Sequence, residues 1–256
     1  MKTAIGARSV LVVGIVLLAA PGARAAEPLV TNWGIGNILH PIQEPASVPG
    51  GGCPKDHVYI FAINGVNPLC QGNFNGFCSY FRKQGYCHTY FGQMYTCLGW
   101  ADRIREVRRC DPEAKIVVVG FSAGANLAKM LVNNLARDCT RVDLLVYLVG
   151  DMLTKSPSTY PPNVGRVLNI RAIGLVLTGG DLFFNGVDIP GARNCRIECR
   201  HILVPSRCET LTLVSEELAA LACGTCATPA QPAPEALPVP AAQPAPVVEP
   251  IPPGKE

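Results

Sequence analysis

The sequence has few charged residues and no run of basic ones. Charged side chains make up 16% of the 256 residues, with 22 basic and 19 acidic ones. Three of the basic residues, Lys2, Arg8 and Arg24, lie in an N-terminal segment that we expect to be removed, which leaves 19 basic residues against 19 acidic ones. A neutral chain without a basic cluster lacks the charge that binds phosphates, so no nucleic-acid partner is predicted.

The chain also lacks an apolar run long enough to span a bilayer comfortably. The apolar stretch Val10–Ala20 follows Lys2 and Arg8 and precedes Ala23-Arg24-Ala25, which has the form of an A-x-A cleavage site. Residues 1–25 are therefore predicted to be a signal peptide, with an uncleaved anchor as the alternative. We expect a secreted or periplasmic protein without an integral membrane segment after cleavage.

Metal-ligand patterns are scarce. Cys223-Gly-Thr-Cys226 has no second C-x-x-C pair and no paired histidines to complete a zinc site, so no metal is predicted. The cysteines are nevertheless many and even in number, which in an oxidising compartment indicates disulfides of unknown connectivity. The twelve are Cys53, Cys70, Cys78, Cys87, Cys97, Cys110, Cys139, Cys195, Cys199, Cys208, Cys223 and Cys226.

The remaining chain divides into three parts. Residues 26–55 contain several prolines and a Pro-Gly-Gly-Gly run, which predicts an irregular segment that wraps the surface. Residues 227–256 are mostly proline and alanine, so we expect an extended, solvated tail, either passive or a docking segment for a protein partner. Residues 56–226 alternate apolar strand patterns with helical ones, which predicts one α/β domain.

That alternation predicts a mostly parallel sheet with helices on both faces, because parallel strands need crossover connections. Ligands in such sheets bind beyond the carboxyl ends of the strands. Strands are expected at His57–Ile63, 86–92, Lys115–Gly120, Val142–Gly150, 166–174 and Asn194–His201, and helices at Phe74–Lys83, Tyr95–Cys110, Ala123–Ala136 and 209–222.

The sequence Gly120-Phe121-Ser122-Ala123-Gly124 has the G-x-S-x-G form of a nucleophile elbow. A β-branched strand pattern precedes it and an alanine-rich helix pattern follows, which is the context the elbow requires. The small residues relieve the crowding around a strained serine between strand and helix. Ser122 is therefore predicted to be a nucleophile; the alternative is an ordinary strand-to-helix turn.

A nucleophilic serine needs a base, and the base needs an acid that orients it. Of the four histidines, only His201 follows Ser122, and it lies between a strand pattern and the last helix. We predict His201 as the base, with a structural histidine as the alternative. Asp151 directly follows a strand and is the first choice for the acid, with Asp181 and Asp188 as alternatives.

An oxyanion hole needs two convergent backbone N–H groups. One should come from Ala123, the residue after the nucleophile. The other should come from the turn after the first strand, where Val66 or Gly65 is the predicted donor and Asn64 a side-chain helper. An ordinary turn is the alternative for this stretch.

The stretches "YIFAING", "VVVGFSAGANLA" and "RHILVPSRCETLTLVSEELA" together resemble the α/β-hydrolase superfamily, over roughly residues 56–222. The resemblance implies an esterase, lipase or related acyl hydrolase that forms an acyl-serine and uses no cofactor. The short connection from Gly150 to Arg166 leaves no room for a helical cap, so we expect an open site for an ester or acyl substrate. Two alternatives are a non-catalytic binding or envelope protein on this scaffold and an acyltransferase with the same triad.

Overall fold

A computed structural model describes residues 35–49, 52–66, 69–95, 97–150, 157–173 and 186–224, to which the structural statements below refer. Six strands form one sheet in the order β2-β1-β3-β4-β5-β6, and every neighbouring pair is parallel. The predicted α/β fold with a parallel sheet is thus confirmed. The strands are β1 (Val58–Ile63), β2 (His88–Gly92), β3 (Lys115–Phe121), β4 (Val142–Leu148), β5 (Val164–Ile173) and β6 (Arg193–Glu198).

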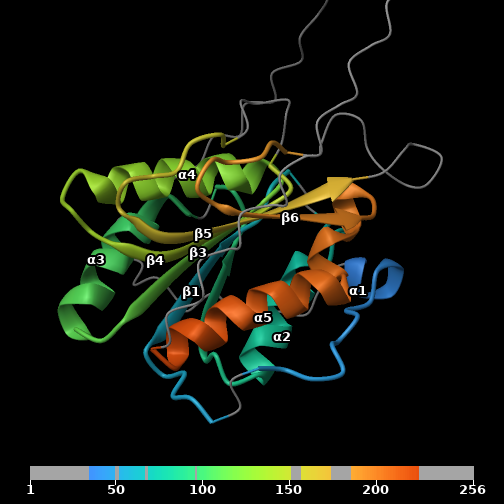
Figure 1. Cartoon of the computed structure of the whole chain (residues 1–256), viewed down its shortest axis with the longest axis horizontal. Coiled ribbons are helices and arrows are strands. Elements are labelled where there is room, and N and C mark those ends of the chain that lie inside the picture. Colours follow the sequence, from blue (N-terminus) through green and yellow to red (C-terminus); the bar gives the residue numbers. More distant parts are fainter. Residues whose placement is uncertain are drawn as a thin grey trace, which may run out of the picture.

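Helices cover both faces of this sheet, α3 and α4 on one and α2 and α5 on the other (Figure 1). Alternate strand residues point to opposite faces, so Ile60 and Ala62 join the core under α2 and α5, while Phe61 and Ile63 join the core under α3 and α4. The helical elements are α1 (Gly36–Leu39), α2 (Phe74–Lys83), η1 (Cys97–Gly99), α3 (Trp100–Cys110), α4 (Ala123–Ala136), η3 (His201–Ser206) and α5 (Cys208–Ala222).

One helix begins later than its sequence pattern predicts. The expected helix from Tyr95 is a turn followed by the 3-10 turn η1, and α3 itself begins at Trp100. Gly99 is the residue before α3, and glycine is costly inside a helix. The apolar spacing that suggested the longer helix included Leu98, which is exposed and not part of the core.

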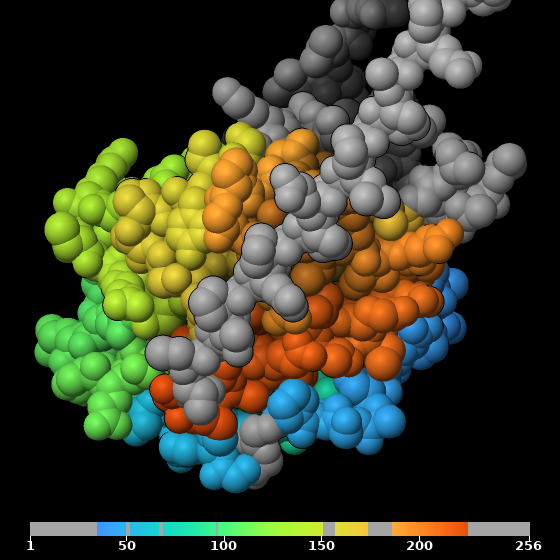
Figure 2. Space-filling view, in the orientation of Figure 1, coloured from blue at the N-terminus to red at the C-terminus, as the bar shows by residue number. Residues whose placement is uncertain are grey.

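The segment before β1 is fastened to the last helical elements. The N–H of Gln43 donates to the carbonyl oxygen of Ser206 at 2.9 Å. A disulfide joins Cys53 to Cys223, across 170 residues of sequence and 5.1 Å between Cα atoms. Figure 2 shows these N-terminal residues, in blue, along one side of the orange-red α5. The prediction of disulfides holds for this pair.

Eight other described cysteines are free thiols, so the described part of the chain does not form the full set of disulfides that was expected. Several of them sit within packed elements, where the core holds their side chains in place. They are Cys70, Cys78, Cys87, Cys97, Cys110, Cys139, Cys195 and Cys208. Cys226 lies outside the described residues, and within them no helix combines the length and apolar character needed to cross a bilayer.

The strand order places a topological switch between β1 and β3. From β1 the chain moves to β2 on one side, then returns to β3 on the other side of β1 and continues outward to β6. Ligand sites in parallel sheets lie where the strand order reverses, beyond the carboxyl ends of the strands. In this chain that place is bordered by the residues after Ile63 and those after Phe121.

Candidate active site

Ser122 occupies the single position between β3 and α4, and its backbone is in a rare conformation. Its torsion angles are φ 56° and ψ −127°. A positive φ is uncommon for a residue with a side chain and costs about 1–3 kcal/mol unless the surroundings enforce it. The Ser122 N–H donates to the Leu148 carbonyl at 2.9 Å, and the Ser122 carbonyl accepts from the Ala125 N–H at 2.9 Å. Strand β4 and the first turn of α4 thus hold the strained residue from both sides.

The two glycines of the motif lie where the backbone packs most closely. A Cβ atom on Gly120 would come within 2.6 Å of the Ala125 Cα atom, in the first turn of α4. A Cβ atom on Gly124 would overlap the carbonyl oxygen of Ile63, at the end of β1. Both positions therefore require glycine, because helix α4 begins in contact with strand and sheet. The G-x-S-x-G spacing follows from this packing.

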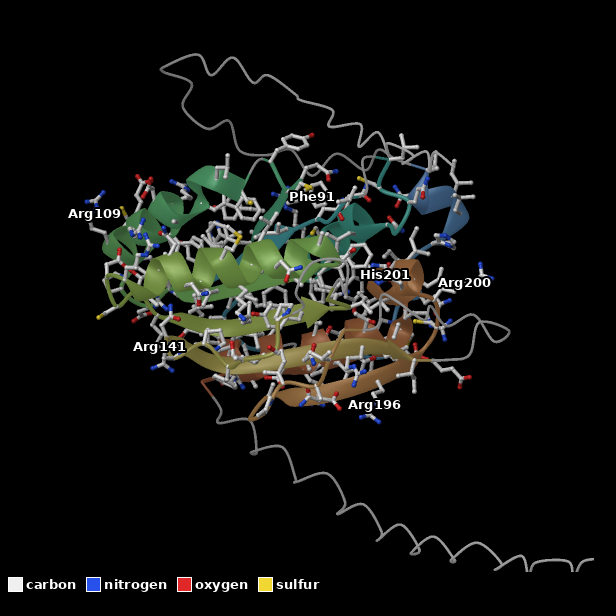
Figure 3. All side chains as sticks on the ribbon, turned by 90° about the horizontal axis from the view of Figure 1, so that it is seen from above. Phe91, Arg109, Arg141, Arg196, Arg200 and His201 are labelled. Carbon is white, nitrogen blue, oxygen red and sulfur yellow. A yellow bond between two sulfur atoms is a disulfide. The ribbon has the colours of Figure 1, made fainter. Side chains whose placement is uncertain are left out.

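His201 lies beside the elbow. It begins η3, and its ring centroid is 5.4 Å from that of Phe121, the residue that precedes Ser122. The ring is half-buried. Figure 3 shows His201 and Arg200 at one end of the molecule and Arg109 and Arg141 at the other. The histidine that sequence order selected is therefore at the carboxyl end of the sheet, in contact with the residue that precedes the predicted nucleophile.

Gly72 lies where η3, which begins with His201, approaches Phe121 at the end of β3. A Cβ atom on Gly72 would be 3.0 Å from the Ile202 carbonyl oxygen and 3.0 Å from Cε1 of Phe121. These distances are shorter than ordinary van der Waals contact, so the backbone of Gly72 packs against both. The position of His201 relative to Phe121 thus depends on a small residue here.

The three candidate acids differ in what the structure describes. Asp151 and Asp181 lie outside the described residues. Asp188 is exposed, and its two oxygens accept hydrogen bonds from Arg171 and Arg196, each at 2.7 Å. These two guanidinium groups lower the pKa of Asp188. Its described contacts are thus ion pairs that join β5 to β6, and the identity of the triad acid stays a prediction.

The turn after β1 lies directly against the elbow. A Cβ atom on Gly65 would be 2.9 Å from the Ala123 nitrogen and 2.9 Å from the Ser122 Cβ atom. The Gly65 N–H donates to Asn64 Oδ1 at 3.0 Å. The side chain of Val66, the next residue, is 75% exposed. All three predicted oxyanion residues, Gly65, Val66 and Ala123, therefore belong to one junction between the first turn and the elbow.

A buried polar group that the sequence analysis missed lies beneath this turn. Asn64 Nδ2 donates to Gln93 Oε1 at 3.1 Å, and Gln93 Nε2 lies 3.5 Å from the Cys70 sulfur. Asn64 and Cys70 are fully buried, and Gln93 is 9% exposed. One signal in the sequence could have indicated Gln93: it directly follows the strand pattern 86–92, at the same edge as Asn64.

A surface hollow of about 560 Å³ lies elsewhere, between residues that include Ala136, Arg141 and Asn163. These residues come from the end of α4 and from the segments that lead into β4 and β5, at the amino ends of those strands. Since Ser122 lies at the opposite edge of the sheet, this hollow is not part of the candidate site.

Comparison with known proteins finds no matching family model and no similar curated protein. Among solved structures, a presumed hydrolase of the alpha/beta superfamily from Xanthomonas campestris pv. campestris is 13% identical, with a TM-score of 0.35 over 64% of this chain and 96% of that one. Aspergillus fumigatus lipase B is 13% identical, with a TM-score of 0.37 over 71% of this chain and 65% of the lipase, slightly less than two thirds of its length. At these values, neither likeness bears on the activity of this chain.

Proposed function

We propose that this chain is an exported serine hydrolase that cleaves carboxylic esters through an acyl-serine intermediate. The single observation that supports this most is the backbone of Ser122, with φ 56° and ψ −127° between a buried strand and a helix. A strained serine between a strand and a helix is the arrangement that exposes a nucleophile to substrate.

The proposed reaction uses groups that lie around the elbow. Ser122 Oγ attacks the ester carbonyl while His201 takes its proton, and His201 then gives that proton to the leaving alcohol. The N–H groups of Ala123 and of the turn after β1 stabilise the oxyanion of each tetrahedral intermediate. His201 then deprotonates a water molecule that attacks the acyl carbonyl, and it returns this proton to Ser122 Oγ as the acyl–Oγ bond breaks and the acid is released. Asp151 is the proposed acid that orients His201, with Asp181 and Asp188 as alternatives.

Export is part of the proposal for two reasons. Residues 1–25 have the charge and hydropathy pattern of a signal peptide. The disulfide between Cys53 and Cys223 is a bond that persists in oxidising compartments.

An open site without a helical cap would accept large or surface-bound esters.

A fluorophosphonate probe tests the proposal directly, because it labels only a serine that is activated as a nucleophile. The purified protein should take up one probe molecule at Ser122, located by peptide mass spectrometry. Ser122→Ala should take up none, and His201→Asn should react at least about 100-fold more slowly because its base is missing. His57→Gln, at the amino end of β1, is the matched control and should react at the wild-type rate.

The outcome also separates the proposal from its two rivals. A wild-type protein without label would contradict the proposal and favour a binding protein on the same scaffold. Equal label on Ser122→Ala would contradict Ser122 as the nucleophile. If the label is confirmed, turnover of a p-nitrophenyl ester in the presence of an added alcohol distinguishes transfer from hydrolysis. Capture of the acyl group by the alcohol faster than by water would identify an acyltransferase.

A further inference from the structure

We infer that Gln93 is a positioning residue for the oxyanion hole and that it acts through the side-chain amide of Asn64. The inference rests on the proposed function, since it concerns the same site. Gln93 contacts Asn64, at the end of the neighbouring strand.

The pairing of β1 with β2 brings the two amides together. Ile63 is the register partner of Gly92, and the Asn64 N–H extends this ladder by donating to the Gly92 carbonyl at 2.8 Å. Asn64 and Gln93 therefore leave the ends of adjacent parallel strands side by side. Their side chains meet there, with Asn64 Nδ2 donating to Gln93 Oε1 at 3.1 Å.

Hydrogen-bond chemistry determines which way each amide points. The Gly65 N–H can only donate, so the Asn64 atom that faces it must be the acceptor Oδ1, at 3.0 Å. Asn64 Nδ2 must then face an acceptor, which Gln93 Oε1 provides. Gln93 in turn directs Nε2 toward the Cys70 sulfur at 3.5 Å. A rotated Asn64 amide would set Nδ2 against the Gly65 N–H, with two donors facing each other.

Burial makes this arrangement costly to disturb. Asn64 is fully buried and Gln93 is 9% exposed, so solvent water has little access to replace a lost hydrogen bond between them. A buried amide that loses its partner is destabilised by its full desolvation cost. The bond to Gln93 Oε1 thus favours one orientation of the Asn64 amide.

The orientation of Asn64 affects which backbone N–H groups can serve the proposed oxyanion hole. The Gly65 N–H is engaged by Asn64 Oδ1, which leaves the N–H of Val66 as the second donor beside that of Ala123. Gly65 itself is held within van der Waals contact of Ser122 and Ala123. Because the Asn64 amide fixes Gly65, and Gly65 precedes Val66, the Asn64–Gln93 pair sets where the Val66 N–H lies relative to Ser122.

The test replaces Gln93 by methionine, which has a similar length but offers Asn64 only a weak sulfur acceptor in place of the amide oxygen. With a p-nitrophenyl ester, Gln93→Met should lower kcat by about 10- to 100-fold, the size of effect that misplacement of a catalytic group produces. KM should change by less than about 3-fold, because the oxyanion forms only after binding. Affinity for a boronic acid that forms a tetrahedral adduct on Ser122 should fall in step with kcat. Gln93→Glu keeps an acceptor for Asn64 and should recover most of the activity.

A second measurement reads the hydrogen bond without reference to activity. The Gly65 amide should exchange with deuterium about 10-fold faster in Gln93→Met than in the wild type, because Asn64 no longer keeps one orientation. Gly76 is the internal control, since its N–H donates to Asn73 Oδ1 at 3.2 Å in the same kind of bond. Gln84→Met, at the end of α2, is the control for the substitution itself and should change neither measurement.

These measurements separate the inference from the proposed function. Unchanged kcat and unchanged Gly65 exchange in Gln93→Met, with a labelled and active wild type, would overturn the inference alone. A wild type that neither labels nor turns over ester would overturn the proposed function and with it the catalytic role of the pair. In that case a faster Gly65 exchange would show that the Asn64–Gln93 pair holds the turn after β1 in a protein that forms no oxyanion there. If Gln93→Met does not fold, Gln93→Glu provides the test. Full activity of Gln93→Glu supports the inference, and a large loss of kcat contradicts it.

Discussion

The ring of His201 lies 5.4 Å, centroid to centroid, from the ring of Phe121, although 80 residues separate them in sequence. Phe121 is the last residue of β3 and Ser122 follows it, so the aromatic contact brings the start of η3 to the strand-to-helix junction at Ser122. The packing of Gly72 against both Phe121 and Ile202 supports this contact from the α2 side. The relative position of the proposed base and the proposed nucleophile thus depends on a small number of interior contacts.

Substitution of Gly72 by alanine should therefore disturb catalysis more than stability. The added Cβ atom would lie 3.0 Å from the Ile202 carbonyl oxygen and 3.0 Å from Phe121 Cε1, so both must shift by a few tenths of an ångström. We expect kcat for a p-nitrophenyl ester to fall by about 10-fold, because base and nucleophile no longer align. Gly52→Ala is the matched control, since nothing lies within 4 Å of its added atom. Equal kcat for the two variants would contradict the prediction.

The disulfide between Cys53 and Cys223 should stabilise the fold strongly, because it closes a loop of 170 residues in the unfolded chain. Replacing both cysteines by serine should lower the free energy of unfolding by up to about 5 kcal/mol. Urea denaturation measures the change, and wild-type protein treated with dithiothreitol should unfold at the midpoint of the double variant. Cys87→Ser, at an exposed free thiol, should stay within about 0.5 kcal/mol of the wild type. A double variant as stable as the Cys87 variant would rule out a stabilising disulfide.

The ion pair between His57 and Asp111 should make stability depend on pH. The two groups lie 2.9 Å apart, and the hydrogen bond to Asp111 raises the pKa of His57 above its ordinary 6.5. Burial opposes ionisation of Asp111, but hydrogen bonds from His57 and Tyr59 outweigh it and lower the pKa below 3.8. The raised pKa of His57 stabilises the fold below pH 6.5, and this effect is lost as pH rises through the pKa of the folded state. The lowered pKa of Asp111 stabilises the fold above pH 3.8, and this effect is lost as pH falls through the pKa of the folded state.

The pair should therefore contribute most between about pH 4 and pH 6.5. The difference in the free energy of unfolding between the wild type and His57→Gln should be larger at pH 5 than at pH 9, where the histidine is neutral in both states. Chemical denaturation at the two pH values measures it, with His40→Gln as the control for loss of a histidine elsewhere. A difference that stays constant, or grows toward pH 9, would contradict this assignment of the raised pKa.

Local patterns in the sequence predicted most of the elements and the strand-to-helix junction at Ser122. The helices Phe74–Lys83 and Ala123–Ala136 have the predicted bounds, because apolar periodicity and the residues at helix ends act within a few residues of sequence. The elbow is equally local, since the strand, the serine, the two glycines and the helix follow one another directly. The late start of α3 at Trp100 was missed because the exposed Leu98 continues an apolar spacing without joining the core.

By itself, then, the sequence determined an α/β chain with one serine at a strand-to-helix junction and one histidine after it. Tertiary structure alone decided which groups come together around that junction. The pairing of β1 with β2 joins Asn64 to Gln93 across 29 residues, and the packing of η3 against α2 brings His201 to Phe121 across 80. The physical reason is that such contacts depend on strand register and helix packing, which result from burying all the apolar faces together and are not encoded in any short stretch of residues.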